Sequence, residues 1–447
     1  MSAPRLPFID PDRRQMLLGA TAFGLMGQFQ PAWADPGSTR SPAQAPVRDW
    51  RLGVANAPAE GFAEAPLRLI YGKVPADFSG TLYRNGPGWF RYGDDVTGHW
   101  FDGDGMIQRF SLSSERATHS GRFVATEKRR IEQERQQIVM PGFGTHGRPD
   151  APVMSSDDVN AANTALLDVG DRLWALWEGG SPYSVDFHTL ATHGPVTLRD
   201  DLKGMPFLAH PKVEPDGTIW SLGMIGRRAM IYRLDPRGQL LEAQMITLPM
   251  AGYAHDWAVS ERHLILPLQP WVAQSSTPPF VDTLVWKPEE GMKVLVIEKA
   301  DLTRSRVFEL PARAFFHTGD AWEGADGSIT FDVCLTDDPS FGAQYAKDLV
   351  RGIAPPTAEK PLLALVTLKS DGTASLVETS IGAEFPQTDK RRQGKARDLV
   401  IAVHEGERET FGPDGWLVHN WRSGKTDRFR LADHQIAEEP LFAPRPG

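Results

Sequence analysis

The chain has 447 residues, 41% of them hydrophobic and 23% charged, a composition typical of a globular protein with a large core. Its formal net charge is −9 and no run of Lys or Arg stands out, so we expect no nucleic-acid partner. The 42 glycines and 36 prolines, without a low-complexity tract, predict many tight turns and therefore many short strands.

The N-terminal residues have the features of an export signal. Arg13 and Arg14 precede an apolar stretch that is too short to span a membrane, and residues 32–34 read Ala-Trp-Ala, the small-residue pattern of a cleavage site. Paired arginines favour the twin-arginine export route. We therefore predict a signal peptide over residues 1–34, an extended lead-in over 35–60 and a periplasmic protein. An amphipathic N-terminal helix is the alternative.

Short apolar runs bounded by turn residues fill the remainder of the chain. Residues 164–168 and 173–177, joined by Val-Gly-Asp, predict a β-hairpin. Helical patterns are confined to residues 127–138 and 341–351. Many strands without alternating helices predict an all-β sandwich, barrel or propeller, and the length favours a propeller over residues 61–447. Further strands are expected over residues 218–224, 230–234, 263–268, 294–298, 328–335, 362–369, 376–379 and 398–403.

Cys334 is the single cysteine, and it lies in a strand-like run at residues 330–335. It has no partner for an intrachain disulfide. We expect a small buried core residue rather than a nucleophile.

Three of the twelve histidines share a context. His210, His255 and His317 are flanked by apolar or aromatic residues, and each precedes a strand-like run. The innermost strands of a propeller converge on one axis, so histidines at their starts can meet and hold a metal ion. No short spacing such as His-x-x-x-His links the three, and three unrelated histidines are the alternative.

A series of short motifs extends from residue 84 to residue 445. They are RNGP (84–87), HWFDGDGM (99–106), NT (163–164), LWEGG (176–180), AHPK (209–212), HDW (255–257), EFP (384–386) and EPLFAPR (439–445). In this order they resemble the motifs of the carotenoid cleavage oxygenases, the retinal pigment epithelial membrane protein family. The resemblance covers the chain from about residue 60 to residue 447.

The resemblance implies a seven-bladed β-propeller with a dome of loops and short helices over one face. It implies one Fe(II) per chain on the propeller axis, with O2 as co-substrate. Three of the four family iron ligands correspond to His210, His255 and His317. The fourth histidine normally follows the motif at Glu439 and is absent from this chain, so we expect a C-terminally truncated chain with an incomplete last blade.

The resemblance also assigns roles around the iron. Glu178, Glu384 and Glu439 match glutamates that accept hydrogen bonds from the ligating rings. Such partners fix the tautomer and the direction of each imidazole. Thr164 matches a residue that crowds an open iron position, although an ordinary strand threonine is the alternative reading.

The substrate site should be apolar, and Phe101 and Trp177 are expected in it. Relatives that cleave lignin-derived stilbenes have a lysine where this chain has Trp177, and they use a tyrosine that is missing from residues 140–147. The substitution favours a carotenoid or apocarotenoid, taken up with possible shallow membrane contact. The alternatives are a stilbene- or phenylpropanoid-cleaving dioxygenase, a non-catalytic or inactive truncated propeller, and a zinc site held by the three histidines.

Overall fold

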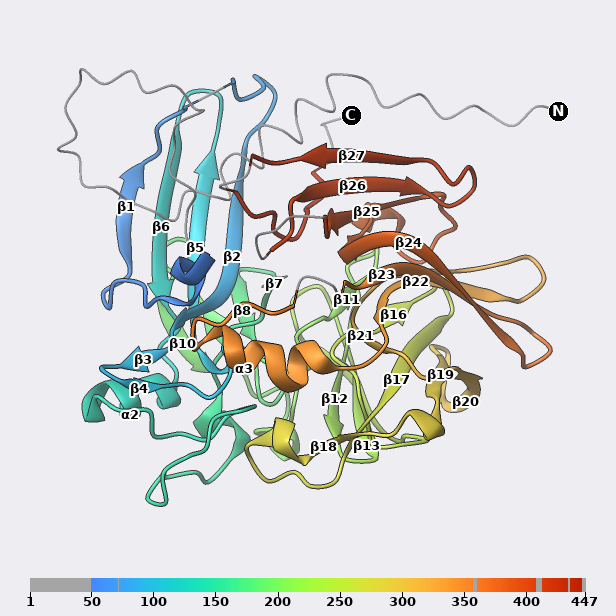
Figure 1. Ribbon diagram of the computed structural model, residues 1–447, viewed down its shortest axis with the longest axis horizontal. Coiled ribbons are helices and arrows are strands. Elements are labelled where there is room, and N and C mark those ends of the chain that lie inside the picture. Colours follow the sequence, from blue (N-terminus) through green and yellow to red (C-terminus); the bar gives the residue numbers. More distant parts are fainter. Residues whose placement is uncertain (1–49, 71, 357–359, 407–411, 433–434, 444–447) are drawn as a thin grey trace.

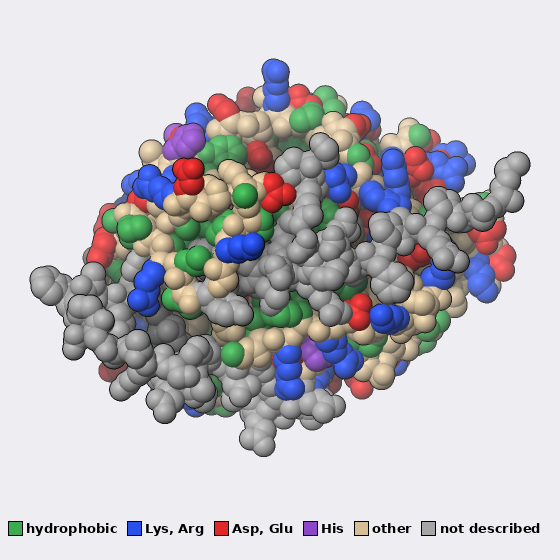
Figure 2. All heavy atoms as spheres, turned by 90° about the horizontal axis from the view of Figure 1, so that it is seen from above, with side chains coloured by type: hydrophobic (Ala, Val, Ile, Leu, Met, Phe, Trp, Pro, Cys, Tyr) green, Lys and Arg blue, Asp and Glu red, His purple; other side chains and the backbone are tan. Residues whose placement is uncertain are grey.

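The computed structural model describes residues 50–70, 72–356, 360–406, 412–432 and 435–443. Strands dominate this part of the chain and form successive antiparallel sheets (Figure 1). No helix within it is long and apolar enough to cross a membrane. The predicted signal peptide at residues 1–34 lies outside the described residues. On the face drawn in Figure 2, basic and acidic side chains are interspersed, with apolar side chains between them.

The first three sheets have four strands each. The first has the order β1 (Phe62–Pro66), β6 (Ala117–Phe123), β5 (Asp104–Leu112) and β2 (Gly80–Trp89). The second has the order β10 (Thr192–Pro195), β9 (Tyr183–Val185), β8 (Arg172–Leu176) and β7 (Ala165–Val169). The third has the order β11 (Lys212–Val213), β12 (Ile219–Ile225), β13 (Arg228–Leu234) and β14 (Leu240–Thr247).

The fourth and fifth sheets are larger. In the fourth, β17 (His263–Ala273) pairs with β15 (Gly252–Tyr253), β16 (Ala258–Val259), β18 (Leu284–Trp286) and β19 (Met292–Glu298), and β19 pairs with β20 (Asp301–Leu310). The fifth runs through β21 (Ala314–Glu323), β22 (Ile329–Thr336), β23 (Leu362–Leu368), β24 (Ala374–Gln387), β25 (Leu399–His404), β26 (Gly415–Asn420) and β27 (Thr426–Arg430). A small ribbon joins β3 (Arg91–Tyr92) and β4 (Asp95–Val96).

The long strand β24 belongs to two consecutive units. Its first part pairs with β23 up to Gly382, and its second part pairs with β25 from Ala383 onward. Each unit is an up-and-down antiparallel sheet, which is the construction of a propeller blade. The prediction of an all-β propeller is confirmed, and the predicted hairpin over residues 164–177 is the pair β7–β8.

Short helical elements connect the sheets. They are η2 (Trp50–Val54), η3 (Trp100–Asp102), α2 (Glu127–Arg135), η4 (Ser156–Val159), η5 (Asp200–Leu202), η6 (Phe280–Thr283), η7 (Pro288–Glu290), the π-helical turn η8 (Phe341–Tyr345), α3 (Ala346–Leu349) and η9 (Lys390–Arg392). η3 contacts α3, and η6 contacts η8, so these turns gather over one region of the propeller. The predicted lead-in is not wholly extended, because its described part contains η2, where Nε of Arg51 donates to the carbonyl of Gly352 at 2.9 Å.

The predicted helices are shorter than the pattern suggested. α2 begins after Thr126, whose hydroxyl accepts from the amide of Arg129, and ends at Arg135 because Gln136 adopts a left-handed φ of 51°. Gln136 and Gln137 continue the polar pattern without continuing the helix, and Ile138 is buried.

The largest apolar core lies between the third, fourth and fifth sheets. Trp257, Phe308 and Phe331 are among its fully buried members. Cys334 is also fully buried, in β22, and burial raises the pKa of its thiol well above the usual value. A thiol in that state is a poor nucleophile, which agrees with its interpretation as a core residue.

Candidate metal centre

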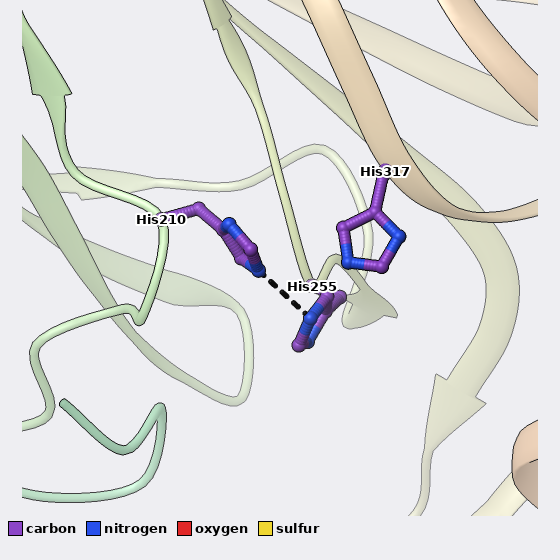
Figure 3. Close-up of side chains that lie close together, drawn as sticks. All are labelled: His210, His255 and His317. Carbon is purple, nitrogen blue, oxygen red and sulfur yellow. Dashed lines mark hydrogen bonds between the residues drawn. The ribbon is translucent and has the colours of Figure 1, made fainter. Parts of the chain in front are cut away.

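Three histidines from three different sheets point toward one another (Figure 3). His210 lies just before β11, His255 between β15 and β16, and His317 inside β21. The pairing of β21 with β22 shifts register between Phe315 and Thr318, a break of the kind that redirects a side chain. The three histidines therefore meet as the propeller argument predicts. Each also precedes the strand-like run predicted after it, and His317, which lies within β21, is followed by β22 (Ile329–Thr336).

The nitrogens of this cluster are close enough to share one ion. One ring nitrogen from each histidine lies within 4.8 Å of the other two, and Nε2 of His210 is 2.9 Å from Nε2 of His255. Nδ1 of His255 lies 2.7 Å from Oε2 of Glu178, and Nδ1 of His317 lies 2.8 Å from Oε2 of Glu384. A carboxylate can only accept, so both rings carry their proton on Nδ1. Nε2 of each ring is left with a lone pair for a metal.

Burial and neighbouring charges shift the pKa values of the rings of His210 and His317 in different directions. Burial lowers the pKa of His210 well below its usual value, so this imidazole is neutral at pH 7. Burial also lowers the pKa of His317, but the charge and hydrogen bond of Glu384, with the charges of Asp256 and Glu439, together outweigh it and the net shift is upward. Only a neutral ring ligates a metal, so protons compete with a metal ion for Nε2 of His317.

The carboxylate of Glu178 accepts two hydrogen bonds. Besides His255 at Oε2, it accepts from the hydroxyl of Tyr253 at Oε1, 2.7 Å away. Burial, and then the charge of Glu178, raises the pKa of Tyr253 well above its usual value, so this hydroxyl stays a donor. Tyr253 was not singled out from the sequence, and its place two residues before His255 was the only available signal.

Glu439 does not contact the three histidine rings, and its predicted role as a partner of a ligating histidine stays a prediction. Its Oε1 accepts from Nε2 of Gln387 at 2.5 Å, and within the described ranges it makes no hydrogen bond with any of the three histidines. It is near enough for its charge to contribute to the raised pKa of His317. Glu178 and Glu384 therefore contact the cluster, whereas Glu439 does not.

The later histidines are engaged elsewhere. Nδ1 of His404 bonds Oδ1 of Asp414 at 2.5 Å, and Nδ1 of His419 bonds the hydroxyl of Thr426 at 2.9 Å. His434 lies outside the described residues. The cluster of possible metal ligands in the described part of the chain thus consists of His210, His255 and His317.

A cavity of about 2390 Å³ opens beside the cluster. All three histidines lie in its wall, and so do the predicted residues Phe101, Thr164 and Trp177. Phe316 belongs to the aromatic part of the wall and adjoins the histidine cluster: its ring centroid lies 5.6 Å from that of His255 and 6.0 Å from that of Phe101. The aromatic faces beside the imidazoles suit an apolar ligand.

Polar residues of the HWFDGDGM motif build this aromatic wall and do not belong to the metal cluster. Nδ1 of the buried His99 accepts from the amide of Phe101 at 3.1 Å, and its Nε2 bonds the carbonyl of Gly342 at 2.8 Å. The Asp102 carboxylate accepts from the amide of Phe143 at 2.6 Å, among other donors. These bonds fix the backbones that carry Phe101 and Phe143.

Thr164 occupies the cavity wall just before β7. Its hydroxyl donates to Oδ1 of Asn163 at 3.1 Å, and its amide donates to the carbonyl of Leu176 at 3.0 Å. Nδ2 of Asn163 in turn donates to the carbonyl of Phe101 at 2.8 Å. The Asn-Thr pair therefore joins the second sheet to the aromatic wall, and the role of Thr164 beside an iron position stays a prediction.

The fold and this histidine cluster together define a class, β-propellers with a candidate metal centre where their inner strands meet. The family model described as "Retinal pigment epithelial membrane protein" matches residues 56–447. The chain therefore belongs to this family, that of the carotenoid cleavage oxygenases.

Individual relatives agree with this assignment. The chain is 28% identical to apocarotenoid-15,15'-oxygenase of Synechocystis sp., over 92% of this chain and 87% of that protein. It is 26% identical to a resveratrol cleavage oxygenase of Botryotinia fuckeliana, over 84% and 72%, and 26% identical to isoeugenol monooxygenase of Pseudomonas nitroreducens, over 84% and 82%. A solved variant of the Synechocystis apocarotenoid oxygenase superposes with a TM-score of 0.79 at 26% identity, covering 89% of this chain and 87% of that one.

Proposed function

We propose that this chain is a non-haem Fe(II)-dependent dioxygenase that cleaves a C=C bond of a carotenoid or apocarotenoid with O2 and forms two carbonyl products. The observation that carries the proposal is the approach of His210, His255 and His317 to within 4.8 Å beside a large, aromatic-walled cavity. Neutral imidazoles suit Fe(II), and when bound the iron supplies activation of O2.

The protein's own residues prepare the site for this chemistry. Glu178 and Glu384 hold the Nδ1 protons of His255 and His317, which keeps Nε2 of each ring free. The aromatic wall around Phe101 and Phe316 binds an apolar chain and excludes water from the reacting bond. No side-chain nucleophile or general base is required.

Metal analysis of the purified protein tests whether the chain binds iron. We expect one Fe(II) per chain, and O2-dependent turnover that Fe(II) restores to the metal-free protein and Zn(II) does not. Turnover restored by Zn(II) would favour the zinc site. A protein that binds no metal and turns over no substrate would favour the non-catalytic propeller.

Two features support a polyene over a phenolic alkene. The position before Glu178 is Trp177, which offers no cation to a phenolate. The hydroxyl of Tyr253 donates its proton to Glu178, so it has none to donate to a phenolate. Some relatives carry names of phenolic alkenes, so an apocarotenal, a hydroxystilbene and isoeugenol should be assayed side by side. Turnover of the hydroxystilbene or isoeugenol alone would contradict the polyene proposal.

The mouth of the cavity supports shallow contact with a membrane that supplies the polyene. Leu52, Val153, Met154 and Ile225 line the cavity and are exposed, Met154 by 93%. We expect the protein to float with lipid vesicles and Met154→Asp to reduce that association. Flotation of the variant equal to that of the wild-type protein would contradict it.

Periplasmic location is proposed on the basis of residues 1–34 alone. Arg13 and Arg14 support export by the twin-arginine route. Replacing both by Lys should retain the protein in the cytoplasmic fraction. Recovery of this variant from the periplasm would contradict the proposed route.

A further inference from the structure

A buried carboxylate connects the three histidine-bearing segments behind the candidate metal centre. Asp256 follows His255 directly and is only 2% exposed. Its Oδ1 accepts from Nζ of Lys212 at 2.7 Å, and its Oδ2 accepts from the amide of Thr318 at 2.9 Å and from its hydroxyl at 3.0 Å. Lys212 stands two residues after His210, and Thr318 directly follows His317, so one side chain joins all three segments.

Trp257 strengthens the same connection. Its indole Nε1 donates to the backbone carbonyl of His210 at 2.8 Å, and its own carbonyl accepts from the Thr318 hydroxyl at 2.7 Å. Its amide donates to Oδ1 of Asp256 at 2.7 Å. Trp257 and Thr318 are buried, so little water competes for these bonds.

His210 depends on this network more than the other two histidines do. His255 is oriented by Glu178 and His317 by Glu384. No carboxylate of the described residues accepts a hydrogen bond from the ring of His210. Its direction is therefore set by its backbone, which the bonds from Trp257 and Lys212 hold in place.

We infer that Asp256 is a positioning residue, which sets the separation of the three histidines through Lys212 and Thr318. The inference rests on the proposed metal site. A ligand set must be held to within about 0.5 Å of its working geometry. Loss of a residue that orients metal ligands typically weakens metal binding by about 10–100-fold.

The experiment compares Co(II) binding by the full chain and by its Asp256→Asn variant. Calorimetry measures the affinity, and the visible absorption of Co(II) reports the geometry of its ligands. We expect Asp256→Asn to weaken Co(II) binding by about 10–100-fold and to change the absorption bands.

Asp104→Asn is the matched control. Asp104 is 1% exposed and accepts from Nζ of Lys128 at 2.8 Å, so it is also a buried aspartate paired with a lysine. It contacts none of the three histidines. We expect this variant to lose stability but to keep the affinity and the absorption bands of the wild-type protein.

The outcomes distinguish failure of the proposed metal site from failure of the positioning role of Asp256. A wild-type protein that does not bind Co(II) would refute the metal site and the inference with it. Wild-type binding with unchanged affinity and bands in Asp256→Asn, or an equal loss in Asp104→Asn, would refute the inference alone. If Asp256→Asn does not fold, Thr318→Val removes the two hydroxyl bonds and keeps the amide bond. Unchanged Co(II) affinity in Thr318→Val would then overturn the inference.

Discussion

The ring of Phe385 packs against the ring of His317, with the ring centroids 4.2 Å apart and the planes inclined by 33°. Phe385 has a left-handed backbone with a φ of 52°, a conformation that costs a bulky residue about 1–3 kcal/mol. The turn brings the amide of Phe385 to within 2.7 Å of Oε2 of Glu384, the same oxygen that accepts from His317. The strained residue thus contacts the histidine with its ring and holds the carboxylate with its amide.

Comparing Phe385→Ala with Phe385→Gly tests this strain. Both variants lose the ring, so the missing packing cancels between them. Alanine still resists a positive φ and glycine does not, so we expect Phe385→Gly to be more stable than Phe385→Ala by about 1 kcal/mol. Urea unfolding of the two variants measures the difference. An alanine variant as stable as the glycine variant would show that the backbone relaxes when the ring is removed.

Glu178, whose carboxylate accepts hydrogen bonds from His255 and Tyr253, gives a second prediction. Glu178→Gln can still accept from His255 and donate to Tyr253, but it loses its negative charge. We expect Co(II) affinity to fall by about 10–100-fold. Tyr253→Phe removes one bond and keeps the charge, so its effect on affinity should be smaller. Titration of both variants with Co(II) gives the order, and a larger loss in Tyr253→Phe would contradict it.

Much of the fold is determined by which residues are buried, and runs of apolar residues in the sequence predict burial well. β23 (Leu362–Leu368) is apolar along its length, and its predicted range was 362–369. β20 (Asp301–Leu310) was not predicted, because most of its residues are exposed and polar and only cross-strand pairing with β19 keeps it extended. β24 was predicted only at 376–379, because its Gly382 and Pro386 indicate a break where two units in fact share one strand.

The candidate site likewise has residues that the sequence predicts and residues that it does not. The three histidines could be selected because aromatic neighbours and a following strand mark each one locally. The partners that fix them come from distant segments. Tyr253 meets Glu178 across 75 positions, and Asp256 meets Thr318 across 62. No local pattern encodes such a pair, so sequence reasoning without an alignment of homologues could not find it.

Metal binding should stabilise the chain and depend on all three histidines. An ion that binds only the folded state stabilises it by about 2.7 kcal/mol at one hundred times its Kd. We expect Co(II) to raise the Tm of the wild-type protein, and EDTA to reverse the shift. His210→Ala, His255→Ala and His317→Ala should each abolish the shift. His419→Ala is the control and should keep it, because His419 bonds Thr426 and lies outside the cluster.

Asp320 should make the stability of the protein depend on pH near neutrality. It is buried, and its carboxylate accepts from the amides of Ala321 at 2.9 Å and Gly394 at 3.0 Å, while Arg397 pairs with Asp332 instead. Burial raises the pKa of Asp320 to about 7, against about 3.9 in an unfolded chain. Between these two values the folded state keeps a proton that the unfolded chain has released.

The free energy of unfolding should therefore fall as pH rises from about 4 to 7, by up to about 1.4 kcal/mol per pH unit for this group, and the effect should level off above pH 7. The partly buried Glu405, whose pKa burial also raises to about 7, acts in the same direction. Asp320→Asn keeps an acceptor for the two amides but cannot titrate. Its urea-unfolding free energy should vary less steeply with pH than that of the wild-type protein, and two parallel pH profiles would show that Asp320 is ionised throughout.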